Sequence, residues 1–291
     1  MTSYRLIFLD LDGTLIGHDE IVSPRNIRAL EDAQEAGCVI VICTGRNRHM
    51  VEPVAAQWRG HGYAILANGG VIAEWETGRV LDKVTLPGST VPVASRLAHA
   101  AGFPLLCFGV HVDEDGGRQV YIDRRRPPIP EYAERHGHRL IYCDNLENGP
   151  DLAPVSIGVY GSHDATKLLA DQWRDALSAD AAVFHVPGNG EGIWCAFANA
   201  RESGKAASAA KVARMLDIPR EQCLAIGDHV NDIDLLTWAG LGVCMGDGHP
   251  EALACAGHVT GTFADDGVAQ ALERFVLGRC TTRHRVSTSA A

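Results

Sequence analysis

The first predicted strand of this chain ends on two carboxylates. The apolar run Leu6-Ile7-Phe8-Leu9 is followed at once by Asp10-Leu11-Asp12-Gly13-Thr14. A continuous apolar run bounded by turn residues predicts a strand that is buried on both faces, as in a parallel sheet. Asp10 and Asp12 would then reach the edge of that sheet together, where their negative charges repel each other. Because a divalent cation is the usual way to offset such repulsion, the sequence predicts an α/β fold with a metal site at this strand end.

Strand and helix patterns alternate near both ends of the chain. Continuous apolar runs over 38–43 and 222–226 predict further buried strands, and residues 24–36 predict an amphipathic helix. Ser23 is a suitable N-cap for that helix, and Pro24 fits its first turn. Such alternation is typical of a parallel sheet covered by helices on both faces. Ligands of open parallel sheets bind outside the carboxyl ends of the strands, where the two carboxylates are expected.

The middle of the chain follows a different pattern. Residues 86–197 combine short strands, polar turns and helices, with an irregular Pro-rich stretch over 127–131. This pattern predicts a mixed or antiparallel sheet that carries helices on one face. We therefore expect an inserted α+β domain over 86–197, within a parallel-sheet core made of residues 1–85 and 198–280. The polar residues 281–291 predict a disordered tail.

Composition limits the function classes that fit this chain. The formal net charge is −10 over 291 residues, which disfavours nucleic acids because their phosphates need clustered Lys and Arg. There is no apolar run long enough to cross a membrane, and the N-terminus lacks the pattern of a signal peptide. The nine cysteines are scattered without a C-x-x-C pair, so neither a disulfide framework nor a zinc site is expected. These features predict a soluble cytoplasmic protein that binds neither nucleic acid nor membranes.

Three predicted strands each deliver a polar residue at the same edge of the sheet. Asp10 follows the first strand, Thr44 follows the second, and Asp228 follows the strand over 222–226. A carboxylate such as Asp10 can attack phosphorus and form an aspartyl-phosphate, which divides one difficult displacement into two easier steps. Asp228 would complete an oxygen cage for Mg²⁺, a cation that prefers few carboxylates, several waters and phosphate oxygens. The pattern therefore indicates metal-assisted chemistry on a phosphate ester.

Two further carboxylates have distinct expected roles. Asp12 would protonate the leaving alkoxide as a general acid and later deprotonate the hydrolytic water as a general base. Asp232 lies four residues after Asp228, where it would support the metal site or bind the cation through water. The first strand end would thus supply both the nucleophile and the proton transfers, and the strand over 222–226 would supply metal ligands.

Phosphate-binding groups are expected at two other places. Lys205 lies in the first turn of a predicted helix, where the positive end of the helix dipole repels its ammonium group. A phosphate bound at this end would attract both the ammonium group and the free backbone N–H groups of the helix. Thr44 offers a hydroxyl, and Gly45 a backbone N–H, for the oxygens of the same phosphoryl group. These three residues supply the positive and hydrogen-bonding groups that an anionic substrate requires.

Three short motifs could suggest other functions, and each can be checked against the residues that such a function needs. A calcium loop beginning at Asp10 would need Gly at position 15 and Glu at position 21 or 22, but these positions hold Leu15, Ile21 and Val22. A dinucleotide site would need a glycine fingerprint after a strand, whereas Gly240-Leu241-Gly242 follows a predicted helix. The run Arg124-Arg125-Arg126 is typical of a solvated face, and the alternative is an anion contact from the inserted domain.

Several short segments together resemble one protein family. They are residues 10–15 (DLDGTL), 44–46 (TGR), 68–69 (NG), Lys205 and 227–232 (GDHVND). In this order and combination the chain resembles phosphatases of the haloacid dehalogenase (HAD) superfamily, of the Cof-like group with a large α/β cap (type IIB). The resemblance covers the predicted core, about residues 4–83 and 198–277.

The resemblance implies a HAD-type Rossmann-like core, a cap that selects the substrate, and Mg²⁺-dependent hydrolysis of phosphomonoesters through an aspartyl-phosphate. It implies Asp10 as the nucleophile and Asp12 as the acid and base, with Thr44 and Lys205 holding the phosphate. The implied metal ligands are Asp10, Asp12 through its backbone, and Asp228, and the position of Asp232 adds it to the expected metal site. The implied substrate contacts are Thr44, Gly45, Arg46, Asn68, Gly69, Lys205 and Asn231.

The identity of the substrate stays open at this point. Sugar phosphates and phosphorylated polyols or acids are the expected class, and the chain is expected to be a monomer or homodimer. The same catalytic set would serve a phosphomutase or a phosphatase dedicated to one biosynthetic sugar phosphate. An alternative of another class is a non-catalytic sensor of phosphorylated ligands, although a sensor would not need Asp12 because no leaving group requires a proton.

Overall fold

The structure is a computed structural model that describes residues 4–58, 60–112, 119–148, 152–188 and 191–279. Within these residues the strands form two sheets. The eight-stranded sheet has the order β14 (His258–Val259), β13 (Leu241–Cys244), β12 (Cys223–Gly227), β1 (Leu6–Leu9), β2 (Val39–Cys43), β3 (Gly62–Leu66), β4 (Val71–Glu74) and β5 (Val80–Lys83). The six-stranded sheet has the order β10 (Ala181–Pro187), β11 (Trp194–Ala200), β9 (Ser156–Gly161), β6 (Leu106–Phe108), β7 (Val120–Asp123) and β8 (Leu140–Cys143).

Helices connect many of these strands. The α-helices are α1 (Pro24–Glu35), α2 (Arg48–Ala55), α3 (Thr90–Ala100), α5 (Pro130–His136), α6 (His163–Ala176), α7 (Lys205–Met215), α8 (Ile233–Trp238), α9 (Pro250–Cys255) and α10 (Gly267–Phe275). Two short 3₁₀ helices matter for the site, η1 (Ala67–Gly69) and η4 (Val230–Asp232). In the described part of the chain, none of the helices has both the length and the apolar character that crossing a membrane requires.

Contacts between residues divide the chain into two compact units. Unit 1 contains the described residues of Met1–Val41, Ala56–His61 and Ala213–Ala291, and unit 2 contains Ile42–Ala55 and Gly62–Val212. Unit 1 holds β1, β12, β13 and β14, and unit 2 holds β3, β4, β5 and the six-stranded sheet. The domain limits expected at 85/86 and 197/198 stay a prediction, and the expected tail over 281–291 lies outside the described residues.

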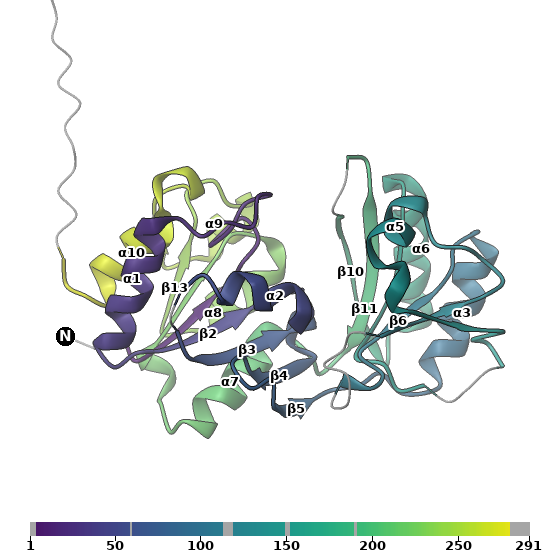
Figure 1. Cartoon of the computed structure of the whole chain (residues 1–291), viewed down its shortest axis with the longest axis horizontal. Helices are drawn as coiled ribbons and strands as arrows, with labels where there is room; N and C mark the ends of the chain where they lie inside the picture. The colour runs from purple at the N-terminus through teal and green to yellow at the C-terminus, as the bar shows by residue number, and fades with distance from the viewer. Residues whose placement is uncertain (1–3, 59, 113–118, 149–151, 189–190, 280–291) are drawn as a thin grey trace, which may run out of the picture. The chain divides into compact units, whose positions relative to one another are not determined.

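Unit 1 is built on parallel strands that are buried on both faces. All four residues of β1 are inaccessible to solvent, and β1 pairs in parallel with β12, which pairs in parallel with β13. Figure 1 shows α1 and α10 side by side, and the Asn26 side chain of α1 accepts a hydrogen bond from Ala269 N at 2.9 Å. The Ser23 hydroxyl accepts from Asn26 N at 3.1 Å, which confirms the predicted N-cap.

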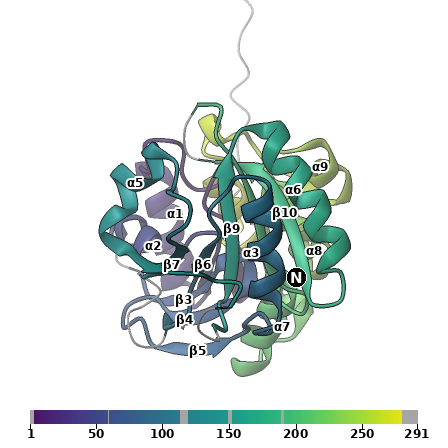
Figure 2. The ribbon, with the colours of Figure 1, turned by 90° about the vertical axis from the view of Figure 1, so that its right-hand side faces the viewer.

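Unit 2 contains a sheet of mostly antiparallel strands, in which only the described pair β7 and β8 is parallel. Figure 2 shows α3 and α6 on one face of this sheet, where the fully buried Trp173 lies in a core shared with Ile157 and Ala196. Helices were expected on one face only, with an irregular stretch over 127–131. That expectation is wrong for α5, since Tyr132 packs in a second cluster with Phe108 and neighbouring residues. The irregular stretch is confirmed over 127–129, whereas Pro130 occupies the first turn of α5, where its missing N–H costs nothing.

The eight-stranded sheet also extends further than its parallel part. β4 pairs antiparallel with β3, and β5 pairs antiparallel with β4. Sequence analysis did not predict these two strands. The residues of β5 are only half-buried or exposed, so its apolar pattern is weak.

Candidate active site

Three carboxylates meet at the carboxyl ends of β1 and β12. Asp10, Asp228 and Asp232 each offer one carboxylate oxygen, and these atoms lie within 4.8 Å of one another. Asp10 is 5 % exposed and Asp232 is fully buried. Charges of one sign at this separation and burial repel strongly unless a cation offsets them. An all-oxygen donor set of this kind fits Mg²⁺, a hard cation that binds carboxylate oxygens and completes its shell with water and phosphate.

The strand register explains how this acidic cluster forms. Leu9 lies opposite Ile226 in the parallel pair, and Asp10 N donates to Ile226 O at 3.0 Å. The turn after β12 is held by Asp232, whose Oδ2 accepts from Asp228 N at 3.2 Å and from His229 N at 3.1 Å. One oxygen of Asp232 therefore shapes the loop that presents Asp228. Asp232 thus combines the supporting role expected from the sequence with a place in the cluster.

Gly13 and Thr14 both lie against the Asp228 carboxylate. Sequence analysis did not single out Thr14. The buried Thr14 hydroxyl donates to Asp228 Oδ1 at 2.7 Å, across 214 residues of sequence. Gly13 has a φ of +82°, and a Cβ there would lie 2.6 Å from Asp228 Oδ2. The DGT part of the motif therefore orients Asp228, because only glycine fits this close approach and only a hydroxyl donates here.

Asp12 is placed differently from the clustered carboxylates. It is exposed and forms an isolated bridge with Ile16, and Gly13 N donates to Ile16 O at 3.0 Å in the same turn. A solvent-facing carboxylate beside the cluster is suited to proton transfer. Its expected roles, as acid and base and as a backbone metal ligand, stay predictions.

Unit 2 brings together the residues expected to bind phosphate. Thr44 is fully buried after β2, and its hydroxyl accepts from Arg46 N at 3.1 Å, so its own proton remains to be donated. Thr44 O accepts from Asn68 N at 3.0 Å, and a Cβ at Gly45 would lie 3.2 Å from Asn68 Oδ1. Gly45 therefore packs directly against Asn68, and Arg46 O accepts from Ala67 N at 3.1 Å. Arg46 is 8 % exposed, and its Nη1 donates to Met50 O at 3.5 Å.

Lys205 is the first residue of α7 and is 1 % exposed. Burying an ammonium group is costly unless anionic or hydrogen-bonding groups compensate it. The backbone of Gly204, directly before it, packs against Gly69 so closely that no side chain would fit at Gly69. The start of α7, which carries Lys205, therefore packs against the same loop as the Thr44 turn, within unit 2. The remaining predicted substrate contact, Asn231, lies in η4 of unit 1, next to Asp232.

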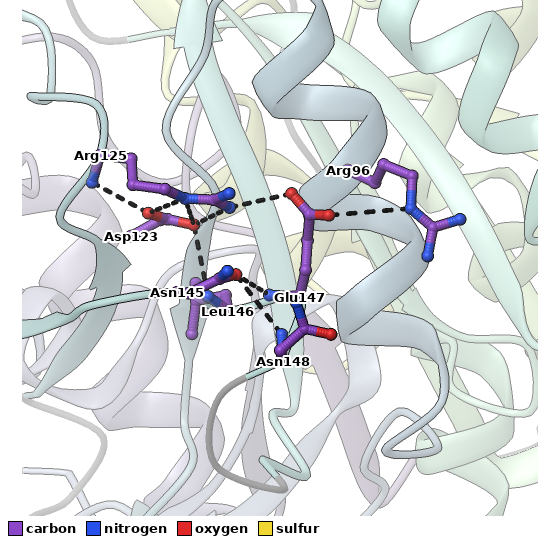
Figure 3. Close-up of polar contacts among 7 residues, drawn as sticks. All are labelled: Arg96, Asp123, Arg125, Asn145, Leu146, Glu147 and Asn148. Carbon is purple, nitrogen blue, oxygen red and sulfur yellow. Dashed lines mark hydrogen bonds and ion pairs between the residues drawn. The ribbon is translucent and has the colours of Figure 1, made fainter.

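The arginine run 124–126 is largely solvated, since Arg124 and Arg125 are exposed and Arg126 is half-buried, but its members have different contacts. Arg124 is exposed and lies 3.2 Å from Asp144, whereas Arg125 donates to the buried Asp123 and to Glu147 (Figure 3). Burial acts to raise the pKa of Asp123, but the hydrogen bonds from Arg125 and Leu146 N outweigh it and lower that pKa. Arg125 therefore holds the end of β7 in place.

Comparison with known proteins supports the interpretation of these motifs. A family model for haloacid dehalogenase-like hydrolases matches residues 7–272. The 5-amino-6-(5-phospho-D-ribitylamino)uracil phosphatase YcsE of Bacillus subtilis is 27% identical over 274 residues, which cover 94% of this chain and 96% of that protein. The HMP-PP phosphatase of Serratia proteamaculans is 25% identical, with 85% of this chain and 86% of that protein covered.

A solved structure is similar over almost the same length. The crystal structure of a haloacid dehalogenase-like hydrolase from Bacteroides thetaiotaomicron has a TM-score of 0.77 and 26% identity, and covers 94% of this chain and 99% of that one. The expected α/β fold with a parallel-sheet core of this type is thereby confirmed. The phosphatase names of the relatives agree with the expected enzyme class, a phosphoric monoester hydrolase. Because the family model spans most of the chain, the protein belongs to the haloacid dehalogenase-like hydrolases.

Proposed function

We propose that this protein is a Mg²⁺-dependent phosphatase that hydrolyses small phosphorylated metabolites through an aspartyl-phosphate on Asp10. The observation that carries the proposal is the cluster of Asp10, Asp228 and Asp232 within 4.8 Å at the end of a fully buried strand. Three carboxylates this close repel one another, and a bound cation would offset that repulsion. Mg²⁺ held by Asp10, Asp228, the Asp12 backbone and Asp232 would supply charge neutralisation for the incoming phosphate.

The chain's own residues divide the reaction between them. An oxygen of Asp10 attacks phosphorus, and the bond from phosphorus to the ester oxygen breaks. Asp12 gives its proton to the leaving alkoxide, which departs as an alcohol, and then takes a proton from the water that attacks the aspartyl-phosphate. Inorganic phosphate and the original Asp10 carboxylate result. Both proton transfers use one exposed carboxylate, in agreement with the placement of Asp12 outside the buried cluster.

Phosphate binding is assigned to the groups gathered in unit 2. Lys205 offsets the charge of the phosphoryl oxygens, and the Thr44 hydroxyl donates to one of them. Gly45, Arg46, Asn68 and Gly69 shape the turn and loop around these groups, and Asn231 contributes from the loop after β12. The burial of Lys205 supports this assignment, because a buried ammonium next to a helix start is suited to an anion.

The substrate class follows from the relatives and remains part of the proposal. Two similar proteins carry the names of phosphatases for a phosphorylated ribitylamino-uracil and for HMP-PP. We therefore propose a phosphate ester of a small metabolite, with sugar phosphates as the first class to test. A cytoplasmic location also remains part of this proposal.

The test is phosphate release from a panel of phosphorylated sugars, polyols, nucleotides and cofactors. Each compound is assayed with Mg²⁺, with EDTA, and with Asp10→Asn as the control. Turnover that needs Mg²⁺ and is lost in the variant supports the proposal. Phosphorylated ligands that bind without turnover would instead indicate a sensor, and transfer of phosphate to a second hydroxyl of the same sugar would indicate a mutase.

A further inference from the structure

The loop after β3 has a backbone that is held in an unusual conformation. Ala67, Asn68 and Gly69 follow one another with φ values of 48°, 50° and 96°. Residues with a side chain rarely adopt this left-handed region, and although Asn tolerates it better than most, Ala67 is sterically disfavoured there. Such a conformation persists only where the surrounding structure holds it, and it is frequent at functional sites. The contacts that hold this loop are therefore informative.

Backbone hydrogen bonds connect the loop to the turn after β2. Ala67 N donates to Arg46 O at 3.1 Å, and Asn68 N donates to Thr44 O at 3.0 Å. The Ser208 hydroxyl, on α7, donates to Gly69 O at 2.8 Å. The loop thus lies between the turn of Thr44 and the beginning of α7, the two segments to which phosphate binding is assigned.

One side chain from the six-stranded sheet also reaches this loop. Asn199, near the end of β11, donates from Nδ2 to Ala67 O at 2.5 Å and is 1 % exposed. The Ala67 carbonyl can only accept, so the amide nitrogen of Asn199 must face it. The amide oxygen accepts from the hydroxyl of Ser156 at 2.9 Å, and Ser156 is the register partner of Asn199 on β9. Both ends of the buried amide are therefore satisfied, and its orientation is fixed.

We propose that Asn199 is a positioning residue that sets the affinity for phosphate by holding the Ala67–Gly69 loop in its left-handed conformation. This inference rests on the proposed function, because the loop matters only if Thr44 and Lys205 bind phosphate. Asn199 is buried and acts through the Ala67 carbonyl. Without its donor, the loop loses a contact that opposes relaxation of Ala67 and Asn68 toward ordinary φ values. The hydrogen bonds of this loop to the Thr44 turn and to Ser208 of α7 would then weaken.

The test compares three variants by calorimetry with inorganic phosphate in the presence of Mg²⁺. Asn199→Ala removes the donor, and we expect the Kd for phosphate to rise about tenfold, the equivalent of one hydrogen bond. Asn199→Asp keeps the size but turns a carboxylate toward the Ala67 carbonyl, so we expect a larger rise. Asn145→Ala is the matched control in the same unit, because its side chain accepts from Glu147 N at 2.8 Å in a loop of its own. We expect no change in the control.

A second measurement separates positioning from a general loss of structure. A crystal structure of Asn199→Ala should have Ala67 and Asn68 at negative φ values, with the six-stranded sheet unchanged. An unchanged Kd, or a left-handed loop retained in Asn199→Ala, would overturn the inference. If Asn199→Ala does not fold, the isosteric Asn199→Asp carries the same two measurements. If the wild-type protein hydrolyses nothing in the panel, the proposed function fails, whereas the phosphate Kd and the loop conformation still decide the role of Asn199.

Discussion

The two sheets of this protein use their strands in different ways. In the parallel pair of β1 and β12 every strand residue is buried, and the polar residues begin only where each strand ends. In the six-stranded sheet, buried polar residues belong to the strands themselves, as in the pair of Ser156, the first residue of β9, and Asn199, near the end of β11. The parallel strands therefore place their chemistry beyond the strand ends, whereas the second sheet includes polar groups in its strand pairing.

The polar groups also have different tasks in the two regions. The carboxylates of Asp10, Asp228 and Asp232, after β1 and β12, lie within 4.8 Å of one another, and charges of one sign at this separation repel unless a cation offsets them. The carboxylate at the end of β7, Asp123, accepts hydrogen bonds from Arg125 and Leu146 N (Figure 3). The first arrangement is suited to catalysis, and the second stabilises the fold.

The substitution Asp10→Asn has the largest expected effect. It removes the nucleophile, so turnover should fall by at least about 10³-fold. Because it also removes one of three clustered negative charges, the melting temperature of the metal-free protein should stay equal or rise. Steady-state kinetics and calorimetric melting check the two parts. Retained turnover would contradict the assignment, and a large loss of stability would mean that Asp10 serves the fold.

Thr14→Val should have the next largest effect. It keeps the shape of the side chain but removes the hydrogen bond to Asp228 Oδ1, so the Mg²⁺ concentration for half-maximal activity should rise about 10- to 100-fold. Thr14→Ser retains the hydroxyl and is the matched control. If Thr14→Val titrates with Mg²⁺ like the wild type, Thr14 does not orient a metal ligand.

Asp123→Asn tests the second region through stability. It should lower the free energy of unfolding by about 1–3 kcal/mol at pH 7, because a buried charge-assisted network loses its anion. The folded-state pKa of Asp123 is lowered, so its contribution is complete above the unfolded pKa of about 3.9 and is lost as the pH falls through the folded value. Urea unfolding from pH 7 to acid pH should show the difference from the wild type disappear. The matched control is Asp144→Asn, since Asp144 is exposed. A difference that persists in acid would contradict the account.

Arg124→Ala should have the smallest effect. Its ion pair with Asp144 is exposed on both sides, so the free energy of unfolding should change by less than about 0.5 kcal/mol. The KM for each substrate of the panel should also stay unchanged. An increase in KM confined to substrates with a second anionic group would instead show that this arginine contributes an anion contact, which the sequence leaves as the alternative.

Sequence analysis predicted the parallel part of the fold and the acidic cluster for a physical reason. A strand buried on both faces must be apolar along its whole length, so Asp10 and Asp228 stand out where the apolar runs end. The predictions were weaker where strands are half-buried, as in β5, or where proline begins a helix, as at Pro130 in α5. Local patterns do not separate these cases.

The contacts that sequence analysis missed join residues far apart in the chain. Thr14 lies 214 residues from Asp228, and Asn199 lies 132 residues from Ala67. No periodicity or spacing reports such a pair, because the contact exists only after the sheets have formed. The Thr14 contact could have been suspected, since a hydroxyl directly follows the D-x-D-G turn. The Asn199 contact carried no local signal.

The most direct test of the central claim is to trap the intermediate on Asp10. The enzyme is mixed with its best substrate and Mg²⁺, quenched in acid and reduced with borohydride, which converts an aspartyl-phosphate to homoserine. Peptide mass spectrometry should then find homoserine at position 10 and nowhere else, and none in Asp10→Asn. Turnover without any homoserine at position 10, or homoserine at another aspartate, would contradict the assignment of Asp10 as the nucleophile.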